Sequence, residues 1–201
     1  MISGFCIALE GIDGSGKSTH SQLLAEFLRL RGFEVLVDHE PTDGPWGRKL
    51  RASATTGRLS PEDELEYFLN DRRQHVKERI APSLAAGKVV ILDRYYFSTM
   101  AYQGARGFDP AEIRMLNEQF APVPDLLLIL DIEVNIALQR VGSRGDIANE
   151  FEKRENLLRC REIFLSLKDE SFVRVISAQD SVDKVAARIQ QLVEECGLLI
   201  P

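Results

Sequence analysis

The sequence predicts an α/β fold in which a doubly wound sheet of five parallel strands is flanked by helices. Five short apolar runs alternate with longer segments of helical periodicity, a pattern typical of strands joined by right-handed helical crossovers. Each run is almost continuously apolar, as in strands that are covered on both faces. With 201 residues, of which 44% are hydrophobic, the chain can bury one core. We therefore expect a single domain over residues 1–201.

The individual elements follow from the same patterns. The predicted strands are Phe5–Leu9, Glu34–Val37, Val89–Leu92, Leu126–Leu130 and Phe172–Ile176. The predicted helices are Lys17–Arg31, which Gly32 closes, Pro61 or Glu62 to Ala86, Pro110–Phe120, Asn135–Arg144, Phe151–Leu167 and Val182–Cys196. Pro82 lies inside the second helix and is expected to kink or end it near Ile80, because proline lacks an N–H and clashes with the preceding turn.

A glycine-rich segment joins the first strand to the first helix. It reads Gly11-Ile12-Asp13-Gly14-Ser15-Gly16-Lys17-Ser18 and matches the phosphate-loop pattern G-x-x-x-x-G-K-S, with Thr19 following. Glycines let successive N–H groups point inward, and the start of the helix adds its positive dipole end. Lys17 supplies a charge for the β- and γ-phosphates, and Ser18 supplies a hydroxyl for Mg²⁺. The segment predicts binding of a nucleoside triphosphate such as ATP.

Composition excludes several other classes of protein. The net charge of −6 and a pI near 5.2 argue against nucleic acid or an anionic membrane as the main partner. No apolar run reaches about 18 residues, and no signal peptide is visible. Three widely spaced cysteines, Cys6, Cys160 and Cys196, lack metal-ligand spacing and are expected to be free thiols. A cytoplasmic location is the natural expectation.

Polar residues that follow the strands are candidates for the site, because ligands of such sheets gather beyond the carboxyl ends of the strands. Asp93 after the third strand could hold Mg²⁺ through water or brace Ser18, and Arg94 could hold a second phosphate group. A surface ion pair is the alternative. The string Ser98-Thr99-Met100-Ala101-Tyr102-Gln103-Gly104 is expected at the same edge.

Two further segments carry charged residues at helical spacing. Arg48 and Arg51 follow the turn His39-Glu40-Pro41-Thr42, where they form either an acceptor-side cluster or a solvated face. Phe68 and Arg72 lie four apart on one helix face, suited to a base that is stacked and hydrogen-bonded, although such a pair is often core plus surface.

Residues 141–153 are polar and glycine-punctuated and are predicted to form a mobile lid. Arg140 and Arg144 enter this segment four residues apart, where they could close on a triphosphate and neutralise charge that develops during phosphoryl transfer. A solvated helix end is the alternative. The loop Ser177–Ser181 could cup an adenine, although Ser181 could equally cap the next helix.

Taken together, these motifs resemble those of the thymidylate kinase family, whose members move the γ-phosphoryl group of ATP onto dTMP. The resemblance covers almost the whole chain. It rests on Glu10 to Thr19 in the phosphate loop, Glu40-Pro41, Phe68 with Arg72, Asp93-Arg94-Tyr95, Ser98-Thr99, Ala101-Tyr102-Gln103-Gly104 and the lid. It implies a kinase that uses ATP with Mg²⁺ and forms a homodimer.

The resemblance also implies roles for single residues. Asp13 would accept the sugar 3′-OH, Phe68 would stack on thymine, and Tyr102 would lie beneath the deoxyribose and disfavour a 2′-OH. Arg72, Thr99 and Gln103 would meet the polar edge of the base. Arg94 would hold the acceptor phosphate, Arg140 would lie against adenine, and Glu152 would be a metal or lid residue. Independently of the resemblance, Arg51 is expected to bind the substrate on the acceptor side.

Family members differ in whether the catalytic arginine lies in the phosphate loop or in the lid. Gly14 occupies the loop position, so the chain resembles the lid-arginine type and Arg144 becomes the candidate. The sequence departs from the family pattern at His39, where an arginine is frequent, and at Asn149-Glu150, where Asp-Arg is common. The first departure affects one acceptor-side contact. The second removes a positive charge and adds a negative one, which weakens the inference from the family to a metal or lid role for Glu152.

Two alternatives remain open at this point. A kinase for another deoxynucleotide or deoxynucleoside would use the same scaffold, although Arg94, Arg48 and Arg51 favour an acceptor that already carries a phosphate. A nucleotide switch or motor ATPase would share the phosphate loop. Against this second alternative, there is no guanine-reading Asn-Lys-x-Asp motif, and Arg94 follows Asp93 where a motor would place a catalytic glutamate.

Overall fold

The computed structural model describes residues 4–57, 59–142 and 150–197, except for the side chains of 54–56 and 150–153. Within it, five parallel strands form one sheet in the order β2-β3-β1-β4-β5. The strands are β1 (Phe5–Glu10), β2 (Val35–His39), β3 (Val89–Asp93), β4 (Leu126–Asp131) and β5 (Val173–Ser177). The predicted fold class is confirmed, since all four strand pairs are parallel.

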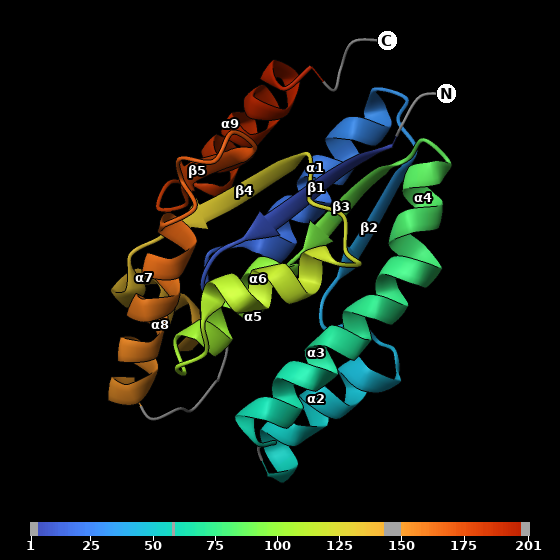
Figure 1. The fold of residues 1–201 in the computed structure, drawn as a ribbon. Coiled ribbons are helices and arrows are strands. Elements are labelled where there is room, and N and C mark those ends of the chain that lie inside the picture. Colours follow the sequence, from blue (N-terminus) through green and yellow to red (C-terminus); the bar gives the residue numbers. More distant parts are fainter. Residues whose placement is uncertain (1–3, 58, 143–149, 198–201) are drawn as a thin grey trace.

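Helices cover both faces of this sheet. They are α1 (Lys17–Leu30), α2 (Pro45–Thr56), α3 (Pro61–His75), α4 (Ala81–Ala85), α5 (Tyr96–Gly104), α6 (Pro110–Glu118), α7 (Val134–Gly142), α8 (Glu150–Leu165) and α9 (Val182–Glu195). Helices α1 and α9 pack together on one face, while α5 and α6 lie on the other (Figure 1). Helix α5 also contacts both α3 and α8.

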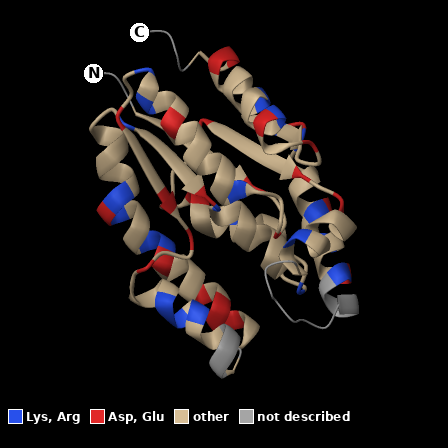
Figure 2. Cartoon of the chain, turned by 180° about the vertical axis from the view of Figure 1, so that it is seen from behind, with Lys and Arg blue, Asp and Glu red and all other residues tan. Residues whose placement is uncertain are grey.

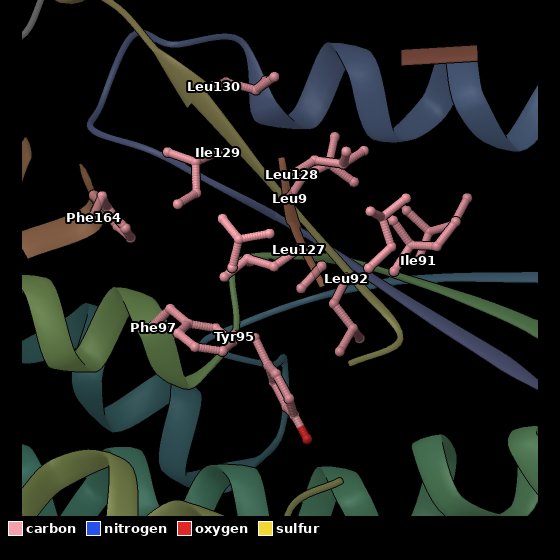
Figure 3. Close-up of a cluster of buried hydrophobic side chains, with 14 of the residues drawn as sticks. Leu9, Ile91, Leu92, Tyr95, Phe97, Leu127, Leu128, Ile129, Leu130 and Phe164 are labelled. Atoms are coloured by element: carbon pink, nitrogen blue, oxygen red, sulfur yellow. The ribbon is translucent and has the colours of Figure 1, made fainter. Parts of the chain in front are cut away.

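The core lies between the central strands and the helices. Leu9 of β1, Ile91 and Leu92 of β3, and Leu127 to Leu130 of β4 are almost completely buried, with Tyr95, Phe97 and Phe164 packed against them (Figure 3). Each such aliphatic side chain contributes about 1.5–3 kcal/mol when it leaves water. This burial makes the three central strands a rigid base for the polar residues at their ends.

The two edge strands depart from the prediction that every strand is covered on both faces. Residues of β2 are only partly buried and its last residue, His39, is exposed, while buried and more exposed positions mix along β5. Each of these strands has a neighbour on one side only. A short apolar run does not by itself distinguish such edge strands from central ones.

The long helix that was predicted from Pro61 to Ala86 is interrupted by a wider turn. Helix α3 ends at His75, a π-helical turn spans Val76–Ile80, and α4 follows from Ala81 to Ala85. The chain therefore stays helical through Pro82, and the regular α-helix is interrupted over Val76–Ile80, where a kink or an end near Ile80 was expected. The π turn changes the hydrogen-bond ladder just before proline, which has no N–H to contribute.

Helices α2 and α5 were not among the predicted helices. Helix α5 is short, and most of its residues are buried, so it lacks the one-sided apolar stripe by which a surface helix is recognised. Helix α2 begins with proline at its first position, where proline is common because the first N–H groups of a helix have no partner within it. Together with α3, α2 forms an arm that extends beyond the sheet (Figure 1).

Parallel pairing brings the carboxyl ends of all five strands to one edge of the sheet. Glu10, Asp93 and Asp131 are the last residues of β1, β3 and β4, and acidic segments can be followed at this edge in Figure 2. In the described part of the chain, no helix is both long enough and apolar enough to cross a membrane.

Candidate active site

The phosphate loop connects β1 to α1 at this edge, and its glycines adopt backbone angles that other residues avoid. Gly11, Gly14 and Gly16 have φ values of 141°, 86° and 94°. The ammonium group of Lys17 donates hydrogen bonds to the backbone carbonyls of Gly11 at 2.8 Å and Ile12 at 2.9 Å. Burial lowers the pKa of Lys17 to about 7, and the nearby charge of Arg94 acts in the same direction. The loop therefore holds a cation that lacks a full counter-charge.

Helix α7 packs directly on the phosphate loop at Gly14. A Cβ atom at Gly14 would lie 2.6 Å from the carbonyl oxygen of Ala137 in α7, so no side chain is accommodated there. One turn further along α7, Arg140 donates from Nη1 to the carbonyl oxygen of Gly14 at 3.3 Å. The close approach of Ala137 leaves no room for an arginine side chain at position 14 of the loop. The hydrogen bond to Gly14 places Arg140 beside the loop.

Ser18 and Asp93 lie together at the start of α1 and the end of β3. The Ser18 hydroxyl donates a hydrogen bond to Oδ2 of Asp93. The other carboxylate oxygen, Oδ1, is buried and has no hydrogen-bond partner among the described residues. A hydroxyl beside a carboxylate with a free oxygen suits a hard cation such as Mg²⁺, which prefers oxygen ligands and keeps several waters.

Arg94 spans the region between the phosphate loop and helix α5. Its backbone has a φ of 69°, a strained value for a residue other than glycine. The guanidinium group donates to Oδ1 of Asp13 and, at 3.2 Å, to the hydroxyl of Ser98. The hydroxyl of Tyr102 accepts a hydrogen bond from the backbone N–H of Asp13 at 3.1 Å. Burial alone would raise the pKa of Asp13, but the charges of Arg94 and Lys17 hold it below its ordinary value.

Glu10 supports this arrangement from the end of β1. It is completely buried, and its carboxylate accepts from the backbone N–H groups of Tyr95 at 2.7 Å and Ser98 at 3.0 Å and from the Ser98 hydroxyl at 2.6 Å. Burial raises the pKa of Glu10 to about 7, although the Ser98 hydrogen bond and the Arg94 charge oppose that shift. Glu10 thus ties the start of α5, and with it Arg94, to the central strand.

A cleft of about 780 Å³ opens beside these residues. Its lining comes from the phosphate loop, the segment after β2, and helices α3, α5 and α8, and includes Asp13, Glu40, Phe68, Arg72, Arg94, Tyr95, Thr99, Tyr102, Gln103, Arg106 and Cys160. A second cleft, of about 430 Å³, is lined by Ser18, Asp38, His39 and Asp93 among others. Glu40 and Arg94 line both clefts, so the two meet beside the phosphate loop.

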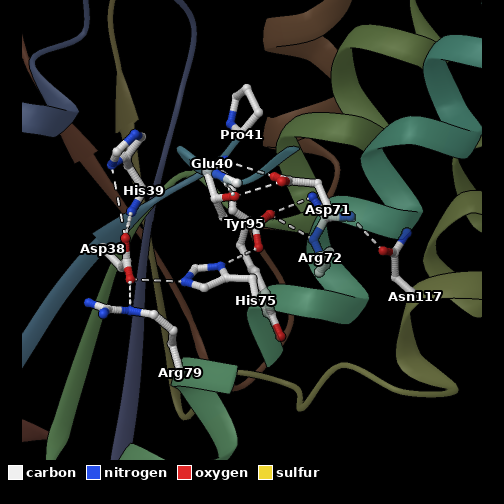
Figure 4. A network of polar contacts seen from close by, with 12 residues as sticks. Asp38, His39, Glu40, Pro41, Asp71, Arg72, His75, Arg79, Tyr95 and Asn117 are labelled. Atoms are coloured by element: carbon white, nitrogen blue, oxygen red, sulfur yellow. Dashed lines mark hydrogen bonds and ion pairs between the residues drawn. The ribbon is translucent and has the colours of Figure 1, made fainter. Parts of the chain in front are cut away.

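Arg72 forms a buried wall of the larger cleft (Figure 4). Its Nε donates to Oε2 of Glu40 at 2.7 Å, Nη1 to the Asn117 side chain at 2.6 Å and Nη2 to the Thr99 hydroxyl at 3.1 Å. At least three of the five N–H donors of the guanidinium group are therefore used within the protein, and Nη2 also lies 2.6 Å from Oε2 of Glu40. A ligand in the cleft meets a fixed edge of Arg72 and not a freely moving side chain.

Gln103 is also held by neighbours across the cleft. Its Nε2 donates to a Glu64 oxygen at 3.2 Å, and its Oε1 accepts from Arg106 at 3.3 Å. Arg106 is itself paired with Glu64. Because Glu64 belongs to α3 and Gln103 to α5, these contacts join the two walls and fix the orientation of the Gln103 amide.

Not every residue expected in the site lies there. Arg51 donates to the backbone carbonyls of Pro41 at 2.7 Å and Thr42 at 2.8 Å, so it braces the loop after β2 and is absent from the cleft lining. Thr19 is exposed at the start of α1. Arg144 and the side chain of Glu152 lie outside the described part of the chain.

Several residues that shape the site were not singled out from the sequence. Glu64 and His75 belong to α3, Arg106 follows α5 and Asn117 belongs to α6, and only the fold brings these residues to the cleft or to its buried wall. Glu10 carried a visible signal, since a carboxylate that continues an apolar strand is expected to be buried and to need partners.

Comparison with known proteins gives a consistent result. A model of the thymidylate kinase family matches residues 9–189 of the chain. Thymidylate kinase of Akkermansia muciniphila is 53% identical over 188 residues, covering 94% of this chain and 90% of that protein. The enzymes of the same name from Xylella fastidiosa (strain M12) and Xanthomonas campestris pv. campestris (strain B100) are 50% and 48% identical, covering 96% and 94% of this chain and 88% and 83% of their own.

Proposed function

This chain belongs to the thymidylate kinase family and is an enzyme that phosphorylates dTMP with ATP, and we propose that the phosphate loop holds ATP while the larger cleft holds dTMP. The observation that carries this assignment is the position of Arg94. It lines both clefts and pairs with Asp13 of the phosphate loop, so it stands where a donor and an acceptor phosphate would meet.

On the donor side, Lys17 exchanges its loop carbonyls for the β- and γ-phosphates when ATP binds. Ser18 and Asp93 are proposed to hold Mg²⁺, Asp93 through water, because their oxygens adjoin and Oδ1 of Asp93 is buried without a partner among the described residues. A cation held there would supply positive charge next to the phosphates. Residues Gly11 to Thr19 would surround the phosphates, and Arg140 would lie against adenine.

On the acceptor side, Phe68 would stack on thymine, and Arg72, Thr99 and Gln103 would present fixed polar groups to its edge. Tyr102 would lie beneath the deoxyribose, where its hydroxyl already contacts the backbone of Asp13. Arg94 would transfer its hydrogen bonds from Asp13 and Ser98 to the acceptor phosphate, which frees the Asp13 carboxylate for the sugar 3′-OH. Arg51 acts on this side indirectly, through the loop that it braces.

Arg144 remains the proposed catalytic arginine within a lid around residues 141–153, in a single kinase domain that spans the chain. The steric contact of Gly14 with α7 supports this, since the phosphate loop has no room for an arginine of its own. The described part of α7 ends at Gly142, two residues after Arg140 has reached the loop, so the lid would begin beside the phosphates. Glu152 is proposed as a metal or lid residue on the family resemblance alone.

We further propose that the enzyme acts in the cytoplasm as a homodimer and takes small nucleotides, not nucleic acid, as partners. The family resemblance supports each of these statements. A kinase for a different deoxynucleotide is not favoured, and neither is a switch or motor.

The test is ADP release by the purified protein with MgATP, measured across dTMP, dUMP, the other nucleoside monophosphates and free nucleosides. We expect activity confined to dTMP and, more weakly, dUMP. Comparable rates with a nucleoside or with a purine monophosphate would contradict the assignment of the larger cleft to dTMP.

A further inference from the structure

We propose that His75 is a positioning residue that holds Glu40 against Arg72 and thereby sets the wall of the dTMP cleft. His75 is the last residue of α3, three residues after Arg72, and it is absent from the cleft lining. It acts through Glu40, which lies after β2 and touches both residues. This inference rests on the proposed function, in which the larger cleft binds dTMP.

The geometry is a chain of alternating charges (Figure 4). Oε2 of Glu40 accepts from Nε of Arg72 at 2.7 Å and lies 2.6 Å from its Nη2, while Oε1 of Glu40 lies 2.9 Å from Nδ1 of His75. On its other side, Nε2 of His75 lies 3.2 Å from Oδ2 of Asp38, which also accepts from Arg79. The side chains of Arg72, Glu40 and His75 are each about 1–3% exposed.

Both ring nitrogens of His75 face a carboxylate oxygen. Nδ1 makes a hydrogen bond to Glu40, whereas Nε2 has only a close charge contact with Asp38 and no aligned hydrogen bond among the described residues. A neutral ring would turn a lone pair toward one of the two carboxylates, so their charges favour the doubly protonated ring. Burial alone would lower the pKa of His75, but the hydrogen bonds and charges of Asp38 and Glu40 raise it to about 9. At neutral pH the ring is therefore a buried cation between two carboxylates.

This arrangement leaves Glu40 one orientation. Each of its oxygens has a different buried cation as its partner, so rotation of the carboxylate would leave at least one oxygen and one cation unpaired in the interior, at a considerable cost. Glu40 in turn fixes the plane of the Arg72 guanidinium group, whose edge is proposed to meet the thymine base. Loss of the His75 contact releases Glu40 and, through it, Arg72.

Two substitutions separate this role from simple packing. In His75→Asn the side-chain amide can take the place of Nδ1 and still donate to Glu40, whereas in His75→Gln the longer amide takes the place of Nε2 and donates to Asp38. Glutamine is closer in volume to histidine. If His75 served only packing, the glutamine variant should bind dTMP better than the asparagine variant. If His75 positions Glu40, the asparagine variant should bind dTMP better. Arg79→Gln is the matched control, because Arg79 contacts the same oxygen of Asp38 but not Glu40.

The measurement is steady-state kinetics with dTMP and ATP varied in turn, together with calorimetric binding of dTMP and a thermal melt of each variant. We expect His75→Gln to raise KM for dTMP about 10-fold, in the range for a buried charged group that loses its partner. KM for ATP and kcat should change little. His75→Asn should stay within about 3-fold of the parent, and Arg79→Gln should leave all constants unchanged.

The reverse order, with asparagine worse than glutamine, would overturn the proposal, and so would equal losses for ATP and dTMP. Variants that no longer fold would also overturn it, since His75 would then serve stability alone. A double-mutant cycle adds a second test: in a Glu40→Gln background, His75→Gln should have almost no further effect on dTMP binding. Additive effects would contradict the coupling. Failure of the parent protein to bind dTMP would instead refute the proposed function itself.

Discussion

At the scale of single residues, Lys17 carries a buried ammonium group whose interactions with the protein are weak in the absence of nucleotide. Its ammonium group is almost inaccessible to water and contacts neutral carbonyl oxygens of its own loop, which is a poor environment for a charge. A triphosphate supplies the missing negative charge. Burial of Lys17 thus favours binding of the triphosphate and lowers the stability of the nucleotide-free protein.

We therefore expect Lys17→Met to lower kcat by at least about 10²-fold, because the lysine interacts most strongly with charge that moves during transfer. The melting temperature should stay the same or rise, since a buried charge is removed and the aliphatic volume is kept. Kinetics and a thermal melt on the same preparation check both parts. A variant that melts well below the parent would show that Lys17 instead stabilises the fold.

The raised pKa of His75 predicts how stability depends on pH. A group whose pKa rises from an ordinary 6.5 to about 9 stabilises the folded state fully below pH 6.5, and this contribution is lost as pH rises through 9. The contribution is about 3 kcal/mol. Burial raises the pKa of Cys6 to about 12 and also raises the pKa of Tyr95. Neither group should therefore lose its proton before His75 does as the pH rises.

Urea unfolding at pH 7 and pH 10 measures this effect, with His75→Asn as the variant that lacks the titration. The free energy of unfolding of the parent should fall more between these pH values than that of the variant. An identical fall in both proteins would assign the loss to other groups.

At the scale of elements, the contact between α7 and the phosphate loop positions the donor side. Gly14 and Gly32 have almost the same φ, 86° and 88°. A Cβ at Gly14 would strike the Ala137 carbonyl, whereas nothing lies within 4 Å of the same atom at Gly32. The two glycines therefore form a matched pair that separates steric contact from backbone strain.

Gly32→Ala should cost about 1–2 kcal/mol from the left-handed backbone alone. Gly14→Ala should cost about 1–3 kcal/mol more from overpacking, and should also raise KM for ATP because α7 and Arg140 are displaced. Urea unfolding and ATP kinetics of both variants measure the difference. Equal destabilisation, with ATP kinetics unchanged, would show that α7 does not constrain the loop.

The lid predicts a different kinetic signature. Arg144→Ala should lower kcat by roughly 10² to 10⁴-fold while both substrates still saturate, as expected for an arginine that stabilises charge only in the transition state. Arg140→Ala should lose mainly ATP affinity. Near-normal turnover in Arg144→Ala would direct attention to Arg154, which contacts Asn135 at the start of α7.

At the scale of the whole molecule, local patterns in the sequence were sufficient for the sheet and for most helices. Buried strands, glycine turns and the phosphate loop are short-range signals, and the five strands lie within one or two residues of their predicted bounds. Helix α5 escaped detection because its residues are buried by helices from distant parts of the chain. Its position depends on packing that no local window contains.

The same limit applies to the site. Residues next to the phosphate loop or a strand end could be proposed from their place in the chain. The partners of Arg72 could not, because Glu40, Thr99 and Asn117 lie 27 to 45 positions away and meet only when α3, α5 and α6 pack together. Arg51 donates to the carbonyls of Pro41 and Thr42, contacts that its spacing in the sequence did not indicate, and its contact with the substrate stays a prediction.

The central claim is that donor and acceptor nucleotides occupy separate sites that meet at Arg94. The variant Phe68→Ala tests this claim most directly. Phe68 lines the larger cleft and does not belong to the phosphate loop, so its loss should affect only the acceptor nucleotide. Its neighbour Tyr67 packs against Trp46 of α2, with ring centroids 5.2 Å apart, which makes Tyr67→Ala a control for truncating an aromatic residue on the same helix.

The decisive measurement is KM for each substrate in these two variants. Loss of a stacked aromatic platform is worth about 1–3 kcal/mol, so Phe68→Ala should raise KM for dTMP by roughly 5- to 150-fold and leave KM for ATP within about 2-fold. Tyr67→Ala should change neither constant by a comparable factor. An equal rise of both constants in Phe68→Ala, or a rise for ATP alone, would contradict the assignment of the cleft to dTMP.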